Sequence, residues 1–107
     1  MVKILLAGDG GQGIQLLSDV ICRAAIEHGL YAASIPNYGL EQRGGVSVSF
    51  IQIQNTPIVY PKFKTGDLVV ILSERSVLRT WRYVGEDTTV IYNASFIPKS
   101  LINLPKR

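Results

Sequence analysis

The stretch Ala7-Gly8-Asp9-Gly10-Gly11-Gln12-Gly13 separates two segments of different periodicity. Residues 2–7 before it form a short, mostly apolar run, as expected of a strand. Residues 13–28 after it carry apolar side chains at steps of three and four, as expected of an amphipathic helix. A strand, a glycine-rich turn and a helix make the first half of a βαβ unit. We therefore predict an α/β, Rossmann-like fold that begins with this unit.

The glycine-rich turn suits a ligand that approaches the backbone closely. Gly8 permits a tight turn out of the strand, and Gly13 lets the helix pack against it. Gly10 or Gly11 can bring backbone N–H groups up to the ligand. The helix N-terminus adds unpaired N–H donors and a partial positive charge, which suit a phosphate or another anion. The candidate cofactor-binding residues of this turn are Gly8, Asp9, Gly10, Gly11, Gln12 and Gly13.

Two features of the sequence limit what this turn can bind. The Asp9 carboxylate would repel a phosphate unless it faces away or is capped. The spacing Gly8-x-Gly10-x-x-Gly13 fits the dinucleotide fingerprint, but a NAD site also needs an acidic residue at the end of the second strand. The second predicted strand, residues 30–35, contains none. An ordinary NAD site is therefore disfavoured, and a tight turn without a ligand stays open as an alternative.

Length and composition restrict the class of protein. The 107 residues have room for one domain, and the shares of hydrophobic (47%) and charged (18%) residues are those of a globular chain. No apolar run reaches the ~18 residues of a membrane span, and the N-terminus lacks the layout of a signal peptide. The single cysteine, Cys22, excludes an internal disulfide framework and fits the cytoplasm, where we expect the protein. A net charge of +3 suits acidic partners, but no basic run with interleaved aromatics indicates nucleic-acid binding.

A second unusual stretch, Pro36-Asn37-Tyr38-Gly39-Leu40-Glu41-Gln42-Arg43-Gly44-Gly45, follows the second predicted strand. It combines glycines with aromatic and charged side chains, and loops of this kind often carry binding residues. Arg43 offers a planar guanidinium fork for a carboxylate or a phosphate. The stretch is also compatible with a surface turn that contains a weak Glu41–Arg43 pair, worth less than ~1 kcal/mol.

The rest of the chain continues the alternation of strands and helices. We predict a strand over residues 46–53, with a bulge near Phe50 or burial on both faces, that forms a hairpin with residues 57–60. A continuous apolar strand over residues 68–72 is typical of a parallel sheet. The later predicted elements are a helix over 73–83, a turn at 85–87 and a strand over 88–92. The predicted sheet is thus mostly parallel, with flanking helices and the hairpin as an insertion.

The helix predicted over residues 73–83 has two faces. Its apolar stripe contains Val77, Leu78 and Trp81. Its basic residues, spaced so that they share another face, are Arg75, Arg79 and Arg82. Such a face is usually only solvated, and the alternative is a docking surface for an acidic partner or an anionic ligand.

The two glycine-rich stretches together resemble one protein family. The first runs from Gly8 to Gly13, and the second has the pattern Pro36-x-Tyr38-Gly39-x-Glu41-x-Arg43-Gly44-Gly45. In this order and spacing they are similar to the gamma subunit or domain of the 2-oxoacid:ferredoxin oxidoreductases, which include the pyruvate, 2-oxoglutarate, 2-oxoisovalerate and indolepyruvate enzymes. The similarity continues through Pro57-Ile58, Asp67-Leu68-Val69 and Asn93-x-Ser95. It covers essentially the whole chain, which resembles the N-terminal part of such a subunit.

The resemblance implies a reaction shared among several chains. In the family, thiamine diphosphate on the alpha and beta subunits attacks the 2-oxoacid, iron–sulfur clusters pass electrons to ferredoxin, and coenzyme A takes the acyl group. The gamma part helps to hold coenzyme A and completes the subunit interface. A chain with one cysteine lacks the usual ligands of a cluster, so the clusters are expected on the alpha, beta or, where present, delta subunits. We assign no catalytic residue and no metal ligand here, and we expect no activity from the chain alone.

The resemblance also implies roles for single residues. Arg43 joins the first glycine turn as a candidate contact to coenzyme A. The candidate residues of the subunit interface are Tyr38, Gly39, Glu41, Gly44 and Gly45. Residues 1–107 are expected to form a single gamma-type domain that is shortened at its C-terminus. Two alternatives from other classes stay open: a stand-alone nucleotide-binding Rossmann-like module, and a structural or assembly piece that binds no ligand.

Overall fold

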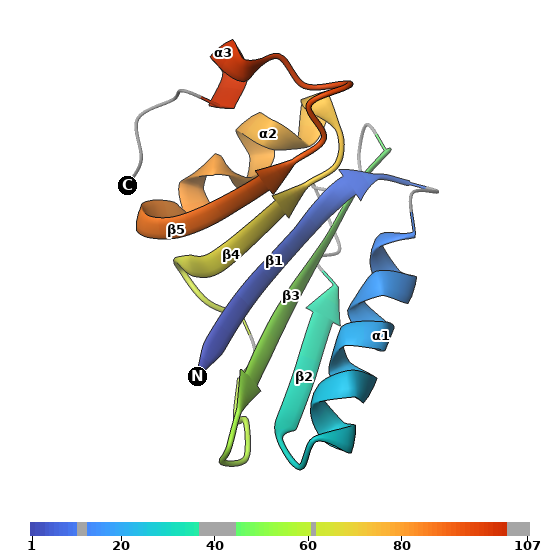
Figure 1. The fold of residues 1–107 in the computed structure, drawn as a ribbon, viewed down its shortest axis with the longest axis vertical. Helices are drawn as coiled ribbons and strands as arrows, with labels where there is room; N and C mark the ends of the chain where they lie inside the picture. The colour runs from blue at the N-terminus through green and yellow to red at the C-terminus, as the bar shows by residue number, and fades with distance from the viewer. Residues whose placement is uncertain (11–12, 37–44, 61, 103–107) are drawn as a thin grey trace.

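One five-stranded sheet organises the fold (Figure 1). The computed structural model describes residues 1–10, 13–36, 45–60 and 62–102. The strand order across the sheet is β2-β3-β1-β4-β5, so the first strand lies at the centre. The strands are β1 (Val2–Asp9), β2 (Tyr31–Pro36), β3 (Val46–Gln54), β4 (Gly66–Ile71) and β5 (Val84–Tyr92).

The strands of this sheet run in mixed directions. β1 is parallel to β4 and β4 is parallel to β5, whereas β3 runs antiparallel to both of its neighbours, β1 and β2. Leu5 of β1 lies opposite Phe50 of β3 and Val69 of β4, which aligns three buried side chains across the middle of the sheet. The prediction of a mostly parallel sheet therefore holds for β1, β4 and β5 only. The sheet is mixed because β3 enters between β1 and β2 in the opposite direction.

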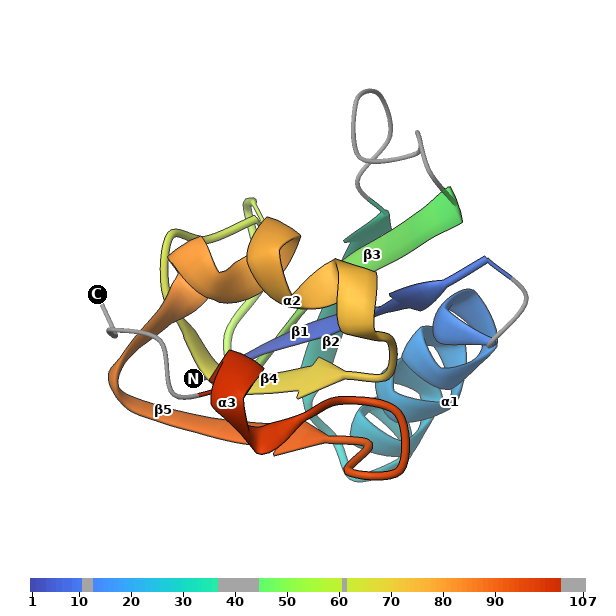
Figure 2. The ribbon, with the colours of Figure 1, turned by 90° about the horizontal axis from the view of Figure 1, so that it is seen from above.

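Helices lie on both faces of the sheet (Figure 2). α1 (Ile14–Glu27) follows the glycine turn, and α2 (Glu74–Thr80) follows β4 and continues into the 3-10 helix η2 (Trp81–Tyr83). A last helical turn, α3 (Lys99–Ile102), comes after β5. Gly29 follows α1 with a φ of 81°, a left-handed conformation that favours glycine and ends the helix. Within the described ranges, no helix combines the length and the apolar character needed to cross a membrane.

Each face of the sheet has its own core. The larger core includes residues of α2 and contains Phe50, whose ring makes edge-to-face contacts with Phe63 and Tyr83 at centroid distances of 5.2 Å. The smaller core lies under α1, where Ile14 packs with Ile51. β3 is thus buried on both faces, and its pairing with β1 runs without a bulge. Of the two predicted explanations for its irregular hydrophobic pattern, burial on both faces is the one that holds.

Two of the elements predicted after β3 are wrong. Residues 57–60 form no strand, so the predicted hairpin does not exist and β3 pairs with β1 and β2 instead. Residues 85–87 form no turn, because they belong to β5. The Thr88 hydroxyl holds this part of β5: it accepts a hydrogen bond from the Gly85 N–H (2.8 Å) and donates one to the Gly66 carbonyl (2.6 Å).

Candidate functional site

Parts of the two glycine-rich stretches meet at the carboxyl end of β1. The Gly10 N–H donates a hydrogen bond to the carbonyl oxygen of Gly45. A Cβ on Gly10 would lie 3.4 Å from that oxygen, and Gly45 has a φ of 80°. The left-handed backbone at Gly45 favours glycine, and the absence of a side chain at Gly10 eases the approach of the two segments.

The topological switch point of the sheet lies beside this contact. β1 and β4 are adjacent and parallel, but the helices that follow them, α1 and α2, cover opposite faces (Figures 1 and 2). Open α/β sheets bind ligands outside the carboxyl ends of two such strands. A hollow of about 380 Å³ lies there, and its lining residues are Asp9, Leu72, Ser73, Glu74 and Phe96.

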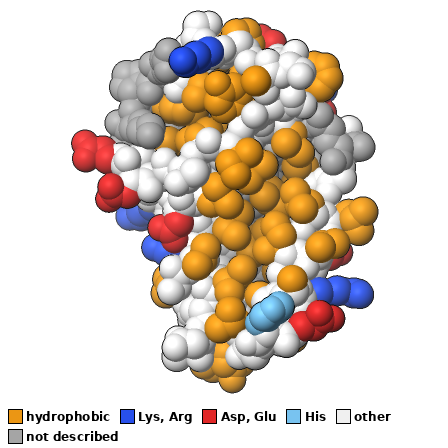
Figure 3. Space-filling view, viewed as in Figure 1, with side chains coloured by type: hydrophobic (Ala, Val, Ile, Leu, Met, Phe, Trp, Pro, Cys, Tyr) orange, Lys and Arg blue, Asp and Glu red, His pale blue; other side chains and the backbone are white. Residues whose placement is uncertain are grey.

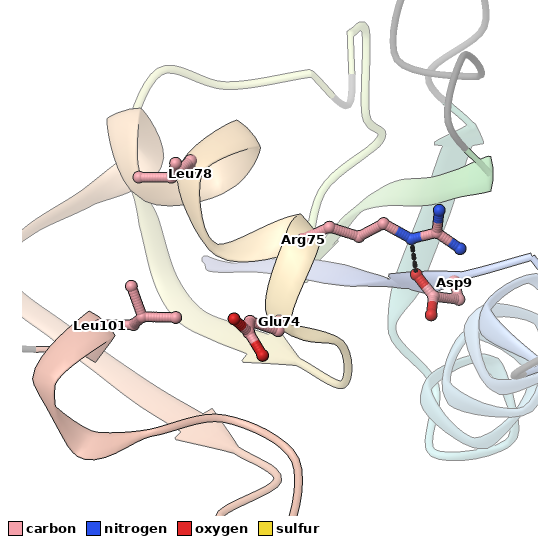
Figure 4. Close-up of a pocket in the computed structure, with 5 residues that line it drawn as sticks. All are labelled: Asp9, Glu74, Arg75, Leu78 and Leu101. Atoms are coloured by element: carbon pink, nitrogen blue, oxygen red, sulfur yellow. Dashed lines mark hydrogen bonds and ion pairs between the residues drawn. The ribbon is translucent and has the colours of Figure 1, made fainter.

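An ion pair crosses the same end of the sheet (Figure 4). Arg75 donates from Nε to Oδ1 of Asp9 over 2.7 Å. Both residues line a further hollow of about 410 Å³, together with Glu74, Leu78 and Leu101. Arg75 also approaches the second glycine-rich stretch, since its Nη2 lies 3.3 Å from the position that a Cβ on Gly45 would take. The guanidinium therefore binds Asp9 of the first stretch and lies beside Gly45 of the second.

The negative charge of Asp9 is compensated in this arrangement. The hydrogen bond from Arg75 lowers the pKa of the Asp9 carboxyl from its ordinary value of 3.8, and a weaker hydrogen bond from Ser73 acts in the same direction. These effects outweigh desolvation, which raises the pKa. The carboxylate is thus capped, which is one of the two conditions under which the glycine turn can accept an anion.

The N-terminus of α1 has the features of an anion-binding helix end. Gly13 is its N-cap with a φ of 77°, and its carbonyl accepts the first helical hydrogen bond, from the Leu17 N–H (2.9 Å). The first turn of α1 contains no acidic residue. Backbone N–H groups at a helix start have no intrahelical partner, and the helix dipole is positive there. A hollow of about 300 Å³ adjoins this end, lined by Asp9, Gly13, Ile14, Gln15, Leu16 and Ser47.

The predicted site residues divide into two groups. Those that the structure describes are Gly8, Asp9, Gly10, Gly13 and Gly45. Those outside the described residues are Gly11, Gln12, Tyr38, Gly39, Glu41, Arg43 and Gly44. Gly8 differs from the expectation: it belongs to β1, opposite Ser47, and the strand continues to Asp9. The tight turn predicted at Gly8 is therefore wrong, because the pairing with β3 extends to the end of the strand.

Arg75 belongs to this end of the sheet although its sequence position does not indicate it. The helical spacing groups it with Arg79 and Arg82 on a basic face. Its partner lies 66 positions earlier in the chain, so no local pattern connects the two residues. The signal in the sequence is the carboxylate of Asp9 inside a turn suited to anions, which calls for a nearby cation without saying which one.

The apolar face of α2 differs from the prediction at one position. Val77 and Trp81 are buried in the larger core, as predicted for an apolar stripe. Leu78 is 72% exposed and lies at the rim of the hollow near Arg75 (Figure 4). One residue corresponds to about 100° of helical rotation, which turns Leu78 away from the core that Val77 enters.

Cys22 and the acidic residues form no metal site in the part of the chain that the structure describes. No group of three or more His, Cys, Asp or Glu side chains there is arranged to hold a metal ion. Cys22 packs against the smaller core, and burial raises the pKa of its thiol. A thiol with a raised pKa is mostly protonated at neutral pH and therefore less reactive.

The sheet, its opposite-facing helices and the glycine turn at the switch point define a Rossmann-like α/β protein. Comparison with protein families identifies the group within this class. The family described as pyruvate ferredoxin/flavodoxin oxidoreductase matches residues 3–107. The chain belongs to this family, which confirms the family predicted from the two glycine-rich stretches.

Curated relatives of the chain are subunits of such enzymes. The chain is 40% identical to the 2-oxoglutarate synthase subunit KorC of Methanothermobacter marburgensis, over 71% of this chain and 41% of that protein. It is 31% identical to the pyruvate synthase subunit PorC of Methanothermobacter thermautotrophicus, over 89% of this chain and 54% of that protein. The chain thus spans about half the length of these relatives.

Solved structures share the fold. The gamma subunit of a keto/oxoacid ferredoxin oxidoreductase from Geobacter sulfurreducens has a TM-score of 0.77 and 24% identity, covering 98% of this chain and 56% of that one. The 2-oxoglutarate:ferredoxin oxidoreductase from Magnetococcus marinus, with 2-oxoglutarate, coenzyme A and succinyl-CoA bound, has a TM-score of 0.75 and 21% identity. The match to that enzyme covers 85% of this chain and 16% of the other. At these identities the likeness concerns the fold.

Proposed function

We propose that the chain is a gamma-type part of a 2-oxoacid:ferredoxin oxidoreductase, in which it helps to bind coenzyme A and completes the subunit interface. Such a complex oxidatively decarboxylates a 2-oxoacid to an acyl-CoA and reduces ferredoxin. Family membership over residues 3–107 and the similarity to KorC and PorC support this proposal. In it, residues 1–107 act as a single gamma-type domain that needs partner subunits for activity.

The observation that carries the proposal is the hydrogen bond between Gly10 and Gly45. It joins the two stretches on which the family resemblance rests, at the end of the sheet where α/β proteins bind ligands. Both residues at this contact are glycines, so no side chain keeps a ligand away from the backbone there. The adjacent helix N-terminus and the capped carboxylate of Asp9 favour an anionic group, and coenzyme A carries several phosphates.

The proposal assigns a role to each part of the site. The backbone of the glycine turn, Gly8 to Gly13, faces coenzyme A, and Arg43 contacts one of its anionic groups. Arg75 keeps the Asp9 carboxylate paired, so that the turn does not repel these groups. The neighbouring subunit is met by Tyr38, Gly39, Glu41, Gly44 and Gly45.

The redox and carbonyl chemistry belongs to other chains in this proposal. Thiamine diphosphate, which activates the 2-oxoacid carbon, sits on the alpha and beta subunits, and the iron–sulfur clusters sit on partner subunits that include delta where it is present. This chain has one cysteine, whereas a cluster typically needs four. Ferredoxin meets the complex rather than this chain, and the complex works in the reducing cytoplasm.

Coenzyme A titration of the purified complex tests the proposed site. Gly10→Val places a branched side chain against the Gly45 carbonyl and is expected to raise the Kd for coenzyme A by about tenfold. Gly10→Ala is the matched control, because its Cβ makes an ordinary contact at 3.4 Å. Arg43→Ala is expected to lower coenzyme A-dependent turnover, and an unchanged rate would remove Arg43 from the site.

Two outcomes of these titrations contradict the proposal. If Gly10→Val weakens subunit association but leaves the affinity for coenzyme A intact, the turn binds protein and the chain is an assembly piece. If a separate titration shows that the isolated chain binds NAD, FAD or an adenine nucleotide with micromolar affinity, whereas the complex has no affinity for coenzyme A that depends on this turn, the chain is a stand-alone nucleotide-binding module.

A further inference from the structure

One face of the sheet is covered over only part of its width. α1 packs over β2 and β3. On the same side of β4 and β5 the described residues provide no helix, whereas α2 covers the other side (Figure 2). Leu101 and Ile102 of α3 also pack against the larger core on that other side. Hydrophobic side chains gather along the middle of the less covered face (Figure 3). An apolar area of this kind marks an interaction site more often than a solvated surface.

We call this uncovered area the open face. Strands β4 and β5 form its floor, and helix α1 forms the wall on one side. Leu68 and Val70 of β4 are partly buried beside the smaller core, and Ile91 of β5 is 52% exposed. On α1, Leu17 is 37% exposed and Val20 is 54% exposed. We define the open face by these residues: Leu17, Val20, Leu68, Val70 and Ile91.

Strand alternation and helical rotation place these side chains on the same side. Val90 and Tyr92 pack against the larger core, so Ile91 between them points to the opposite face of the sheet. On α1, the Cys22 thiol lies beside Ser34 of β2. Leu17 is rotated to the other flank of the helix, toward β1 and β4, and Val20 lies further round on the same side and is more exposed.

The chemistry of the floor specifies an apolar occupant. In the paired stretches of β1, β4 and β5, the positions that point to this side are Ile4, Leu6, Leu68, Val70, Thr89 and Ile91. None of them is charged, so an acidic protein surface or a nucleic acid would find no ionic partner there. Burial of the exposed side chains of Ile91, Leu17 and Val20 would be the main source of binding free energy.

We propose that the open face binds one amphipathic helix from the part of the gamma-subunit fold that this chain does not span. Strands lie about 4.8 Å apart, so β1, β4 and β5 leave a width of about one helix, ~10 Å, beside α1. Parallel strands are normally covered by helices on both faces. The Geobacter gamma subunit superposes on 98% of this chain, which accounts for only 56% of that subunit. The rest of that subunit is chain that has no counterpart among the residues of this one.

This inference rests on the proposed function, since it takes the chain to be a gamma-type part. A binding experiment tests it with the full 107-residue chain and a defined probe. The probe is the part of PorC from Methanothermobacter thermautotrophicus outside the residues matched by this chain, which cover 89% of this chain, and circular dichroism checks that the probe is folded. Calorimetric titration is expected to give a one-to-one complex.

Variants on the two faces of the sheet locate the binding surface. Ile91→Asp puts a carboxylate on the floor and is expected to weaken binding at least tenfold. Val20→Asp, on the wall formed by α1, is expected to weaken it in the same way if the helix lies against both elements. Leu78→Asp is the matched control, because Leu78 is an exposed apolar residue of α2, the helix on the other face, and binding should not change. Circular dichroism checks that each variant is folded.

Several results would overturn this inference. The first is no binding of the probe to the unaltered chain. The second is binding that Ile91→Asp and Val20→Asp leave unchanged. The third is a dimer of the chain that Ile91→Asp dissociates, which would make a second copy the occupant. Loss of coenzyme A binding in the complex would contradict only the proposed function, because the probe titration contains no coenzyme A.

Discussion

Arg75 of α2 donates a 2.7 Å hydrogen bond to Asp9 at the end of β1, 66 positions earlier in the chain. The pair spans the two strands between which the helices change faces. Its side chains are 58% and 34% exposed, so water screens the attraction and the pair contributes less than about 1 kcal/mol to stability. Its main effect is to balance the negative charge of Asp9, which is the one carboxylate of the glycine turn.

Removal of the guanidinium should change the titration of Asp9. We expect Arg75→Gln to raise the pKa of the Asp9 carboxyl toward its ordinary value of 3.8. A pKa that is lower in the folded state adds stability above the unfolded-state pKa, and this contribution is lost as the pH falls through the folded-state pKa. NMR titration of the carboxyl carbon measures the shift. Arg82→Gln, which removes the same charge about two helical turns away, is the control, and equal pKa values in both variants would contradict the assignment.

A buried serine pair links α1 to β3. Ser18 and Ser49 are fully buried, and their Oγ atoms lie 2.9 Å apart. We expect Ser18→Ala to cost about 1–3 kcal/mol of unfolding free energy, because it leaves the Ser49 hydroxyl without this partner. The double alanine variant should lose less than the sum of the two single variants. Urea unfolding of the three variants measures this coupling, and strictly additive losses would contradict it.

The hydroxyl of Thr88 should matter more than its methyl group. It bridges Gly85 and Gly66 where the pairing of β4 with β5 is irregular. Thr88→Val removes both hydrogen bonds and is expected to cost about 1–3 kcal/mol. Thr88→Ser keeps the hydroxyl and should cost less than about 1 kcal/mol. Thermal or urea unfolding compares the two, and a valine variant as stable as the serine variant would be incompatible with the bridge.

The left-handed backbone at the start of α1 should resist substitution. Nothing lies within 4 Å of a Cβ built on Gly13, so Gly13→Ala meets no steric obstacle, but its φ of 77° costs about 1–2 kcal/mol for an alanine. Asparagine tolerates this conformation better, so Gly13→Asn should lose less. Equal unfolding free energies for the two variants would show that backbone strain is not the cause. Gly45→Ala should be at least as costly as Gly13→Ala, because its Cβ also approaches Arg75.

Some helices and strands could be predicted because the residues that indicate them lie within the same short segment of the sequence. The predicted helix over 13–28 is observed as Ile14–Glu27, since apolar periodicity and Gly29 mark its extent. The position of β3 could not be predicted in this way, because strand order depends on pairing between distant segments. A hairpin was the expectation for residues 57–60, whereas β3 is paired on both sides by β1 and β2 and leaves no edge for them.

In the candidate site, too, local sequence signals could be read, whereas contacts between distant segments could not. Gly10 and Gly45 could each be chosen from glycine spacing, but the hydrogen bond between them depends on the fold. Arg75 could not be assigned to the site, because on its own helix it looks like one of several solvated arginines. Leu78 illustrates the opposite error: its apolar side chain predicts burial, but its rotation on α2 leaves it exposed.

In the proposed function the chain works as part of an oxidoreductase complex. Affinity purification of the tagged chain from its source cells, followed by mass spectrometry, cofactor analysis and an absorbance scan, tests this most directly. We predict co-purification with larger subunits that carry thiamine diphosphate and a broad iron–sulfur absorbance near ~400 nm. Recovery of the chain alone, without colour and without thiamine diphosphate, would contradict a role in such a complex.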